Sequence, residues 1–211
     1  MCGRFCIAAV PGELNERYHI SLPSDYSPDY NISPGRKVLA LTCSESKFHV
    51  EMSSWGYTSG HGHLIINARS ETFHEKRIFQ SEDTKRCIIP ASGFYEWKNV
   101  QGKKHPWYIY PKSENLFSFA AIMRKRHESY EVVILTTSSW EPVIDIHPRI
   151  PVILSPEQEN SFLSGLDASQ VREIRMYALT MHEVSTRVNS ASNHGTDLIM
   201  PVHQRDLQSF F

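Results

Sequence analysis

The chain begins MCGRF, and Cys2 is the first residue whose side chain could do chemistry. A cysteine thiol is a nucleophile once it is ionised. If Met1 is removed, Cys2 carries both a free α-amine and a thiol, with ordinary pKa values of about 8 and about 8.5. A cysteine at this position is equally compatible with a small apolar residue that begins a strand. The rest of the chain has to decide between these interpretations.

An amide and a guanidinium occur together in the stretch IINAR (65–69). Asn67 and Arg69 are two residues apart, so in a strand they share one face. One interpretation is the solvent-facing side of an edge strand. The other is a pair of side chains that face a phosphate or a carbonyl, because the planar fork of arginine matches phosphate oxygens.

A carboxylate stands between two aromatic residues in GFYEWK (93–98), where Glu96 lies between Tyr95 and Trp97. Partial desolvation there would raise the pKa of Glu96 and suit it to general acid–base catalysis. An exposed glutamate at the end of a strand is the alternative, and the stretch by itself favours neither.

A histidine and an arginine precede an apolar strand in DIHPRIPVIL (145–154). Pro148 and Pro151 favour extended backbone, which places His147 and Arg149 on one face. This pair is a candidate for a site that faces an anion.

Two further segments favour structural roles. YNISPG (30–35) is typical of a turn at Pro34 and Gly35. His182 and Arg187, in MHEVSTRVN (181–189), are interpreted as structural.

Composition limits the possible function classes. The net charge of −1 gives no global basic field, so any nucleic-acid contact must be local. The four cysteines form no CxxC pair, which argues against a zinc ribbon or a thioredoxin-like site, and we expect no metal and no cofactor. The chain has no signal-peptide pattern and no apolar run of about 20 residues, which favours a reducing cytoplasm.

The elements that must position these residues are mostly strands. Runs rich in Val, Ile, Tyr and Phe predict strands at 37–43, 48–55, 64–69, 87–97, 106–110, 117–123, 131–137, 150–154 and 176–181. The stretch 98–104 predicts a hairpin connection. Helices are expected at 11–18 and 71–79, after Ser155 with its capping partner Gln158, and after Asp167 with Gln170. Because strands and helices do not alternate, we expect one α+β domain over 1–211, with an antiparallel, barrel-like core and peripheral helices.

At this stage two hypotheses compete. One is a cysteine enzyme that uses Cys2 with a histidine and a carboxylate. The other is a binding module in which Arg4, Arg69 and Arg149 form an anion pocket without chemistry.

Taken together, the segments resemble one family. MCGRF, YN-x-x-PG, WGY, INARSET, GFYEW and IHPRIPVIL occur in the order found in the SRAP family of SOS-response-associated peptidase, or abasic-site processing, proteins. The resemblance spans residues 1–154 and is weaker to the end. It implies a pseudo-barrel fold, binding of single-stranded DNA that contains an abasic site, and a covalent thiazolidine link between a processed Cys2 and the sugar. It also implies autoproteolytic activity that exposes the cysteine.

The resemblance also implies roles for residues. Cys2 would be the nucleophile, Asn67 would orient the amine or the sugar, Glu96 would act as general acid–base, and His147 would assist ring opening and proton transfer. The DNA-binding residues would be Arg4, Arg69, Arg149, Arg77, Trp97 and Pro34. The protein would act as a monomer in the cytoplasm, associated with the nucleoid when bound to DNA. A thiol-dependent peptidase and a non-covalent binder of modified or single-stranded DNA remain as alternatives.

The sequence departs from the family at two places. Family members often carry a Pro/Trp-containing insertion before INAR, where this chain has only YTSGHGHLI. They usually have Asp-Arg-Met-Pro after the histidine, where this chain has Pro148, Arg149, Ile150 and Pro151. We expect the core reaction to survive both changes.

Overall fold

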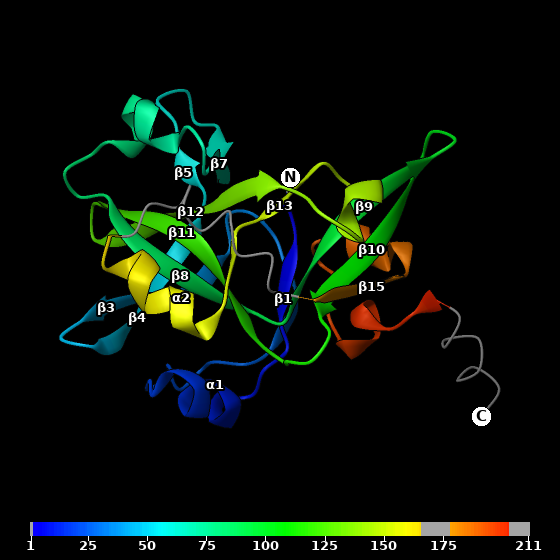
Figure 1. The fold of residues 1–211 in the computed structure, drawn as a ribbon, viewed down its shortest axis with the longest axis horizontal. Helices are drawn as coiled ribbons and strands as arrows, with labels where there is room; N and C mark the ends of the chain where they lie inside the picture. The colour runs from blue at the N-terminus through cyan, green and yellow to red at the C-terminus, as the bar shows by residue number, and fades with distance from the viewer. Residues whose placement is uncertain (1, 166–177, 203–211) are drawn as a thin grey trace.

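The computed structural model describes residues 2–165 and 178–202 (Figure 1). Two main sheets share one core in this part of the chain, and two short helices lie at their periphery. Cys2 lies just before the first strand. None of the helices in the described ranges is long and apolar enough to cross a membrane.

The larger sheet closes on itself. Its central strands pair in the order β12-β4-β3-β8-β11, and β11 pairs again with β12, so these strands form a ring. They are β3 (Lys37–Ser44), β4 (Lys47–Trp55), β8 (Lys85–Ala91), β11 (Phe117–Arg126) and β12 (Ser129–Ser138). Three short strands extend the ring: β7 (Asn67–Arg69) and β13 (Arg149–Pro151) pair with β12, and β14 (Ile153–Leu154) pairs with β11. The ring thereby carries the segments of Asn67 and His147.

The second sheet is antiparallel throughout and carries the segments of Cys2 and Glu96. Its order is β15-β10-β9-β1-β2. The strands are β1 (Phe5–Ile7), β2 (Asp29–Ile32), β9 (Gly93–Val100), β10 (Lys103–Pro111) and β15 (Leu179–Glu183), and a separate hairpin pairs β5 (Tyr57–Thr58) with β6 (Leu64–Ile65). The expected 98–104 hairpin is confirmed: Gln101 and Gly102 connect β9 to β10 with φ values of 51° and 81°. Two consecutive residues with positive φ form the tight turn that matches strand twist.

The core joins the two sheets through aromatic side chains. The ring centroid of Phe5 in β1 lies 5.2 Å from that of Trp55 and 5.6 Å from that of Phe119, and both pairs are edge-on. The ring centroids of Phe94 in β9 and Phe119 are 6.1 Å apart. All four side chains are at most 1% exposed, so β1 is fixed from both sides by apolar burial.

Helix α1 (Pro11–Tyr18) and helix α2 (Pro156–Leu163) confirm two predictions. The backbone N–H of Ser155 donates to the Gln158 side-chain oxygen at 2.7 Å, which is the expected capping contact. The expected helix at 71–79 is wrong: the chain forms two 3₁₀ turns, Phe73–Glu75 and Arg77–Phe79. Extended backbone at Lys76 divides them, and the second turn ends on Phe79, which is buried against Tyr57. The predicted capping signature at Asp167 and Gln170 lies outside the described residues.

The predicted α+β class, with a barrel-like core and peripheral helices, is confirmed, with one correction. The core is not purely antiparallel, because β12 pairs in parallel with β4 and with β7. These pairs join strands that are far apart in the sequence, so no hairpin is needed and local turn signals do not reveal them.

Candidate functional site

The side chains singled out from the sequence come together from four separate segments. Strand β1 pairs with β9 in a register that places Phe5 opposite Phe94, and the N–H of Tyr95 donates to the Arg4 carbonyl at 2.9 Å. The antiparallel direction then carries Cys2 toward Glu96. Strand β7 reaches the same place from the ring sheet, because the Asn67 amide donates to the Cys2 carbonyl at 2.7 Å.

Cys2 is fully buried at the start of this site. Its thiol lies 3.7 Å from the Arg4 carbonyl oxygen. Burial, and then the nearby Glu96 charge, raises the pKa of the Cys2 thiol far above its ordinary value. The thiol is therefore protonated at neutral pH. The side-chain oxygen of Asn67 is also buried, and it has no hydrogen-bond partner among the described residues, so it remains an open acceptor beside Cys2.

Glu96 is 3% exposed, although it belongs to a residue type that is rarely buried. Desolvation raises the pKa of Glu96 to about 7. Of the two interpretations that the sequence left open, the buried carboxylate is the one that agrees with the structure. A carboxyl group with this pKa can both donate and accept a proton at neutral pH.

His147 completes the group. Its Nδ1 atom lies 4.0 Å from a carboxyl oxygen of Glu96, which is an electrostatic contact and is too long for a hydrogen bond. The same Nδ1 lies 3.1 Å from the backbone nitrogen of Arg149, whose N–H donates when Nδ1 carries no hydrogen, and 2.8 Å from the Arg149 carbonyl, which accepts when Nδ1 carries one. Desolvation lowers the pKa of His147, so the neutral ring is favoured at pH 7.

Arg149 is held by an internal partner that the sequence analysis missed. Its guanidinium forms two parallel hydrogen bonds to the Glu71 carboxylate, at 2.8 and 2.9 Å, and it also donates to the Thr136 carbonyl. Both charged side chains are less than a fifth exposed. Such a bidentate pair fixes the loop that carries His147. The available signal was Glu71 itself, two residues after Arg69 in INARSET.

Arg4 is also held from within. It donates to the Asn31 side-chain oxygen at 2.6 Å and to the Val188 carbonyl at 2.7 Å. Asn31 is fully buried, and its amide donates to the carbonyls of Ser190 and Asn193 at 2.9 and 2.8 Å. The sequence pattern around Asn31 predicted only a turn.

The remaining predicted DNA-binding residues lie at the surface or near it. Arg69 and Arg77 are exposed. The half-buried Trp97 donates its indole N–H to the Asn189 side chain at 2.8 Å. Pro34 precedes a tight turn, in which Gly35 has a φ of 84° and donates to the Trp55 carbonyl at 2.8 Å. Arg69 shares β7 with Asn67, and Trp97 follows Glu96 in β9, but no contact joins the four residues into one pocket among the described residues.

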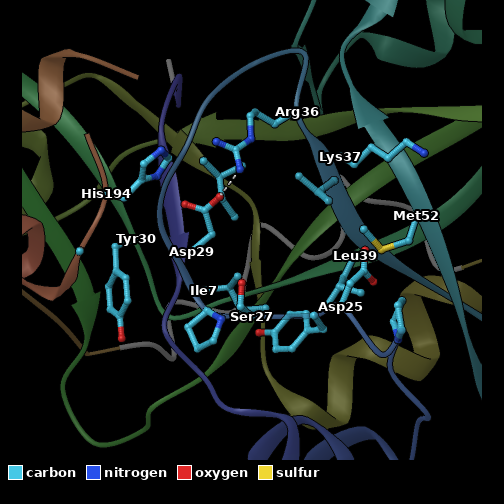
Figure 2. A pocket seen from close by; sticks show the side chains of 16 residues that line it. Ile7, Asp25, Ser27, Asp29, Tyr30, Arg36, Lys37, Leu39, Met52 and His194 are labelled. Carbon is cyan, nitrogen blue, oxygen red and sulfur yellow. Dashed lines mark hydrogen bonds and ion pairs between the residues drawn. The ribbon is translucent and has the colours of Figure 1, made fainter. Parts of the chain in front are cut away.

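A separate cavity of about 360 Å³ lies beside this turn (Figure 2). Its wall includes an ion pair between Asp29 and Arg36 at 2.9 Å, and Tyr26, Tyr30 and Met52 also line it. None of the predicted site residues contributes to this cavity, so it is distinct from the group around Cys2.

No set of three or more His, Cys, Asp or Glu side chains arranged to hold a metal ion occurs in the described part of the chain. The polar groups around Cys2 are one amide, one carboxyl and one imidazole. This set is suited to proton transfer and to orienting a carbonyl compound.

Solved structures share this fold. A crystal structure of a protein from Bacteroides thetaiotaomicron superposes with a TM-score of 0.79, at 22% identity, over 95% of this chain and 100% of that one. A crystal structure of a phage-related protein from Bordetella bronchiseptica has a TM-score of 0.70, at 26% identity, over 88% of this chain and 95% of that one.

Sequence relatives cover nearly the whole chain. The abasic site processing protein YoqW of Bacillus subtilis (strain 168) is 35% identical, over 94% of this chain and 99% of that protein. The abasic site processing protein YedK of Escherichia coli (strain K12) is 32% identical, over 96% of this chain and 100% of that protein. The profile of the family described as SOS response associated peptidase (SRAP) matches residues 1–191. With these matches and the shared fold, the chain belongs to the SRAP family.

Proposed function

We propose that this protein processes abasic sites by binding single-stranded DNA and joining itself covalently to the open-chain sugar through Cys2, after Met1 has been removed. The observation that carries this proposal is the convergence of Cys2, Asn67, Glu96 and His147 from four distant segments. The relatives are named abasic site processing proteins, which supports the abasic site as the substrate.

The proposed reaction needs both nucleophiles of an N-terminal cysteine. The α-amine of Cys2 attacks the C1′ aldehyde of the ring-opened deoxyribose, and water leaves to give an imine. The thiol sulfur then adds to the imine carbon, and its proton passes to the nitrogen. The product is a five-membered thiazolidine ring, with the net loss of one water molecule. The second step is intramolecular, which lowers its barrier by several kcal/mol.

The state of the thiol sets the order of the two steps. Because burial keeps the Cys2 thiol protonated, the amine is the first nucleophile. The thiol closes the ring once the imine carbon lies beside it. Cys6 cannot replace Cys2, because its nitrogen is always an amide.

Glu96 and His147 supply proton transfer in this proposal. With a pKa of about 7, Glu96 can take a proton from the ammonium group and return one to the departing hydroxyl. The neutral His147 assists opening of the sugar ring. Asn67 fixes the Cys2 carbonyl through its amide, and its open side-chain oxygen can accept a hydrogen bond from the amine or the sugar.

DNA binding is assigned to local groups. Arg69 and Arg77 are exposed cations that can reach phosphates, and Trp97 can stack on an unpaired base. Arg4 and Arg149 already donate to internal acceptors. In this proposal they hold the site in place as well as contacting phosphates.

The test uses single-stranded DNA that contains one abasic site, incubated with processed protein and run on a denaturing gel. We expect a heat-stable shifted band that is absent with Cys2→Ala and present with Cys6→Ala. Mass spectrometry of the adduct should show protein plus DNA minus one water.

Absence of the band with protein confirmed to begin at Cys2 would overturn the proposal. A band that persists in Cys2→Ala would identify another nucleophile. Cleavage of added peptides without any adduct would instead favour a thiol-dependent peptidase.

A further inference from the structure

A second cavity, of about 530 Å³, lies at the other end of β1 from Cys2. Ala8 and Ala9, just after β1, line it together with Glu13 of α1. Figure 1 shows β1 near the middle of the molecule and α1 at the bottom. The opposite wall comes from β10, β15 and the segment 199–201. Nothing in the proposed cross-linking reaction uses this cavity.

Aromatic rings form one wall. The rings of Tyr108 and Tyr110 are stacked at 5.1 Å with an interplanar angle of 16°, and the ring of His182 stands edge-on to Tyr110 at 5.4 Å. The two tyrosines are two residues apart in β10, so they lie on the same face of that strand. The register of β15 places His182 opposite Tyr108. Gly93 provides the room for Tyr108, since a Cβ there would lie 2.4 Å from the ring.

Two carboxylates bring negative charge to this cavity. Glu13 and Glu114 contribute two carboxylates, and no lysine or arginine is among the lining residues that the structure describes. Glu13 accepts the Val10 N–H at 2.8 Å through one oxygen, while the contact of its other oxygen within the described ranges is a long one, 3.5 Å to Asn115. That second oxygen retains most of its capacity to accept.

The histidine adds a further acceptor. Nε2 of His182 lies 2.7 Å from the Ile199 carbonyl oxygen. A carbonyl only accepts, so Nε2 carries the hydrogen, and Nδ1 of the neutral ring has a free lone pair. The cavity therefore combines π faces with carboxylate and imidazole acceptors.

We propose that this cavity binds a small organic cation that carries N–H donors, of the alkylamine or polyamine class. Aromatic faces attract cations through their quadrupole, and carboxylates form charge-assisted hydrogen bonds with ammonium groups. A concave apolar site with a few convergent polar groups is the usual form of a small-molecule pocket. The assignment is independent of the proposed cross-linking function. It also gives His182, which the sequence indicated to be structural, a place in a binding site.

The test is a titration of the DNA-free protein with spermidine, at fixed pH and salt, followed by ¹H–¹⁵N NMR. We expect saturable shifts at residues 8–9, 108–110 and 182, and no shifts there with glutamate at the same concentrations. Tyr110→Leu should weaken binding about fivefold, because it removes a π face. Glu13→Gln, which can still cap α1, should weaken it about threefold.

Glu16→Gln is the matched control, because it removes the same charge from an exposed position on α1 outside the cavity. It should leave the affinity unchanged, and melting temperatures establish that each variant is folded. Equal weakening by Glu16→Gln and Glu13→Gln would overturn the proposal in favour of diffuse charge attraction. Shifts that do not saturate, or that glutamate reproduces, would overturn it as well.

Discussion

At the scale of single residues, the environment of Glu96 changes what its carboxyl group can do. An exposed glutamate is ionised at neutral pH, whereas burial to 3% exposure brings the pKa of Glu96 to about 7. The adjacent His147 is shifted in the opposite sense, toward the neutral ring. Both shifts come from desolvation, which disfavours the charged form of either group.

The first prediction concerns the pH dependence of cross-linking. If ionised Glu96 accepts the proton of the ammonium, the adduct rate should rise with an inflection near pH 7, separate from that of the amine near about 8. Glu96→Gln should lower the rate by about 10²-fold to 10⁴-fold and remove the lower inflection. Single-turnover rates on denaturing gels, measured across both inflections, test this. A retained inflection near pH 7 in Glu96→Gln would exclude this role.

The second prediction concerns stability. The pKa of Glu96 is raised from 4.5 to about 7 in the folded state, so folding favours the protonated form. Its contribution to stability is present below about pH 4.5 and is lost as pH rises through about 7. Glu96→Gln should therefore gain stability relative to wild type as pH rises through this window, by up to about 3 kcal/mol. Urea unfolding below and above the window measures the difference, and a pH-independent difference would refute it.

At the scale of elements, the segment that follows β15 is tied to Arg4, which precedes β1, and to strands β2 and β9. Arg4 bonds to the Val188 carbonyl, and Asn31 bonds to the carbonyls of Ser190 and Asn193. Trp97 bonds to Asn189 in the same segment. The side chains of Arg4 and Asn31 thus donate to backbone carbonyls that do not pair with a strand within the described ranges. These hydrogen bonds satisfy the carbonyls in place of a strand partner.

The third prediction tests this connection. Asn31→Ala removes the acceptor of Arg4 and the amide donor to the carbonyls of Ser190 and Asn193, so it should destabilise the protein by about 2–4 kcal/mol. Amide hydrogen exchange should increase over residues 186–193. Ser192→Ala, which removes an exposed hydroxyl from the same segment, is the control and should stay within about 0.5 kcal/mol. Unchanged exchange in Asn31→Ala would show that the segment is held by other contacts.

At the scale of the whole molecule, the net charge bears on attraction to DNA, whereas the topology bears on where charged side chains lie. The net charge of −1 gives little long-range attraction to DNA, so the proposed DNA binding would depend on a few local cations. The closed ring of strands and the antiparallel sheet meet at the aromatic core, and within the ring the pairing of β7 with β12 places Arg69.

The fourth prediction is a shallow salt dependence. Contact with a few phosphates, about two to four, predicts a slope of log affinity against log salt of about −1.5 to −3 for single strands. With Cys2→Ala protein, so that binding stays reversible, Arg69→Ala should reduce the slope by about 0.7. Arg187, which is paired with Asp197, provides the control Arg187→Ala, with an unchanged slope. An equal loss in both variants would remove Arg69 from the phosphate contacts.

Much of the architecture followed from local patterns. Runs rich in Val, Ile, Tyr and Phe located most strands, and capping chemistry located α2, because both depend on neighbours in the chain. The stretch 71–79 did not follow its local pattern, because burial of Phe79 against Tyr57 favoured two 3₁₀ turns. The parallel pairs of β12 depend on segments far apart in sequence and had no local signal.

The sequence by itself determined which residue types the site contains: Cys2 at the chain start, Asn67 in a strand, and Glu96 among aromatics. The tertiary structure decided which groups meet and how their protons are held. It placed Asn67 on the Cys2 carbonyl, gave Arg149 the partner Glu71, and desolvated Glu96. The physical reason is that desolvation and long-range pairing arise from burial by remote segments, which no local pattern encodes.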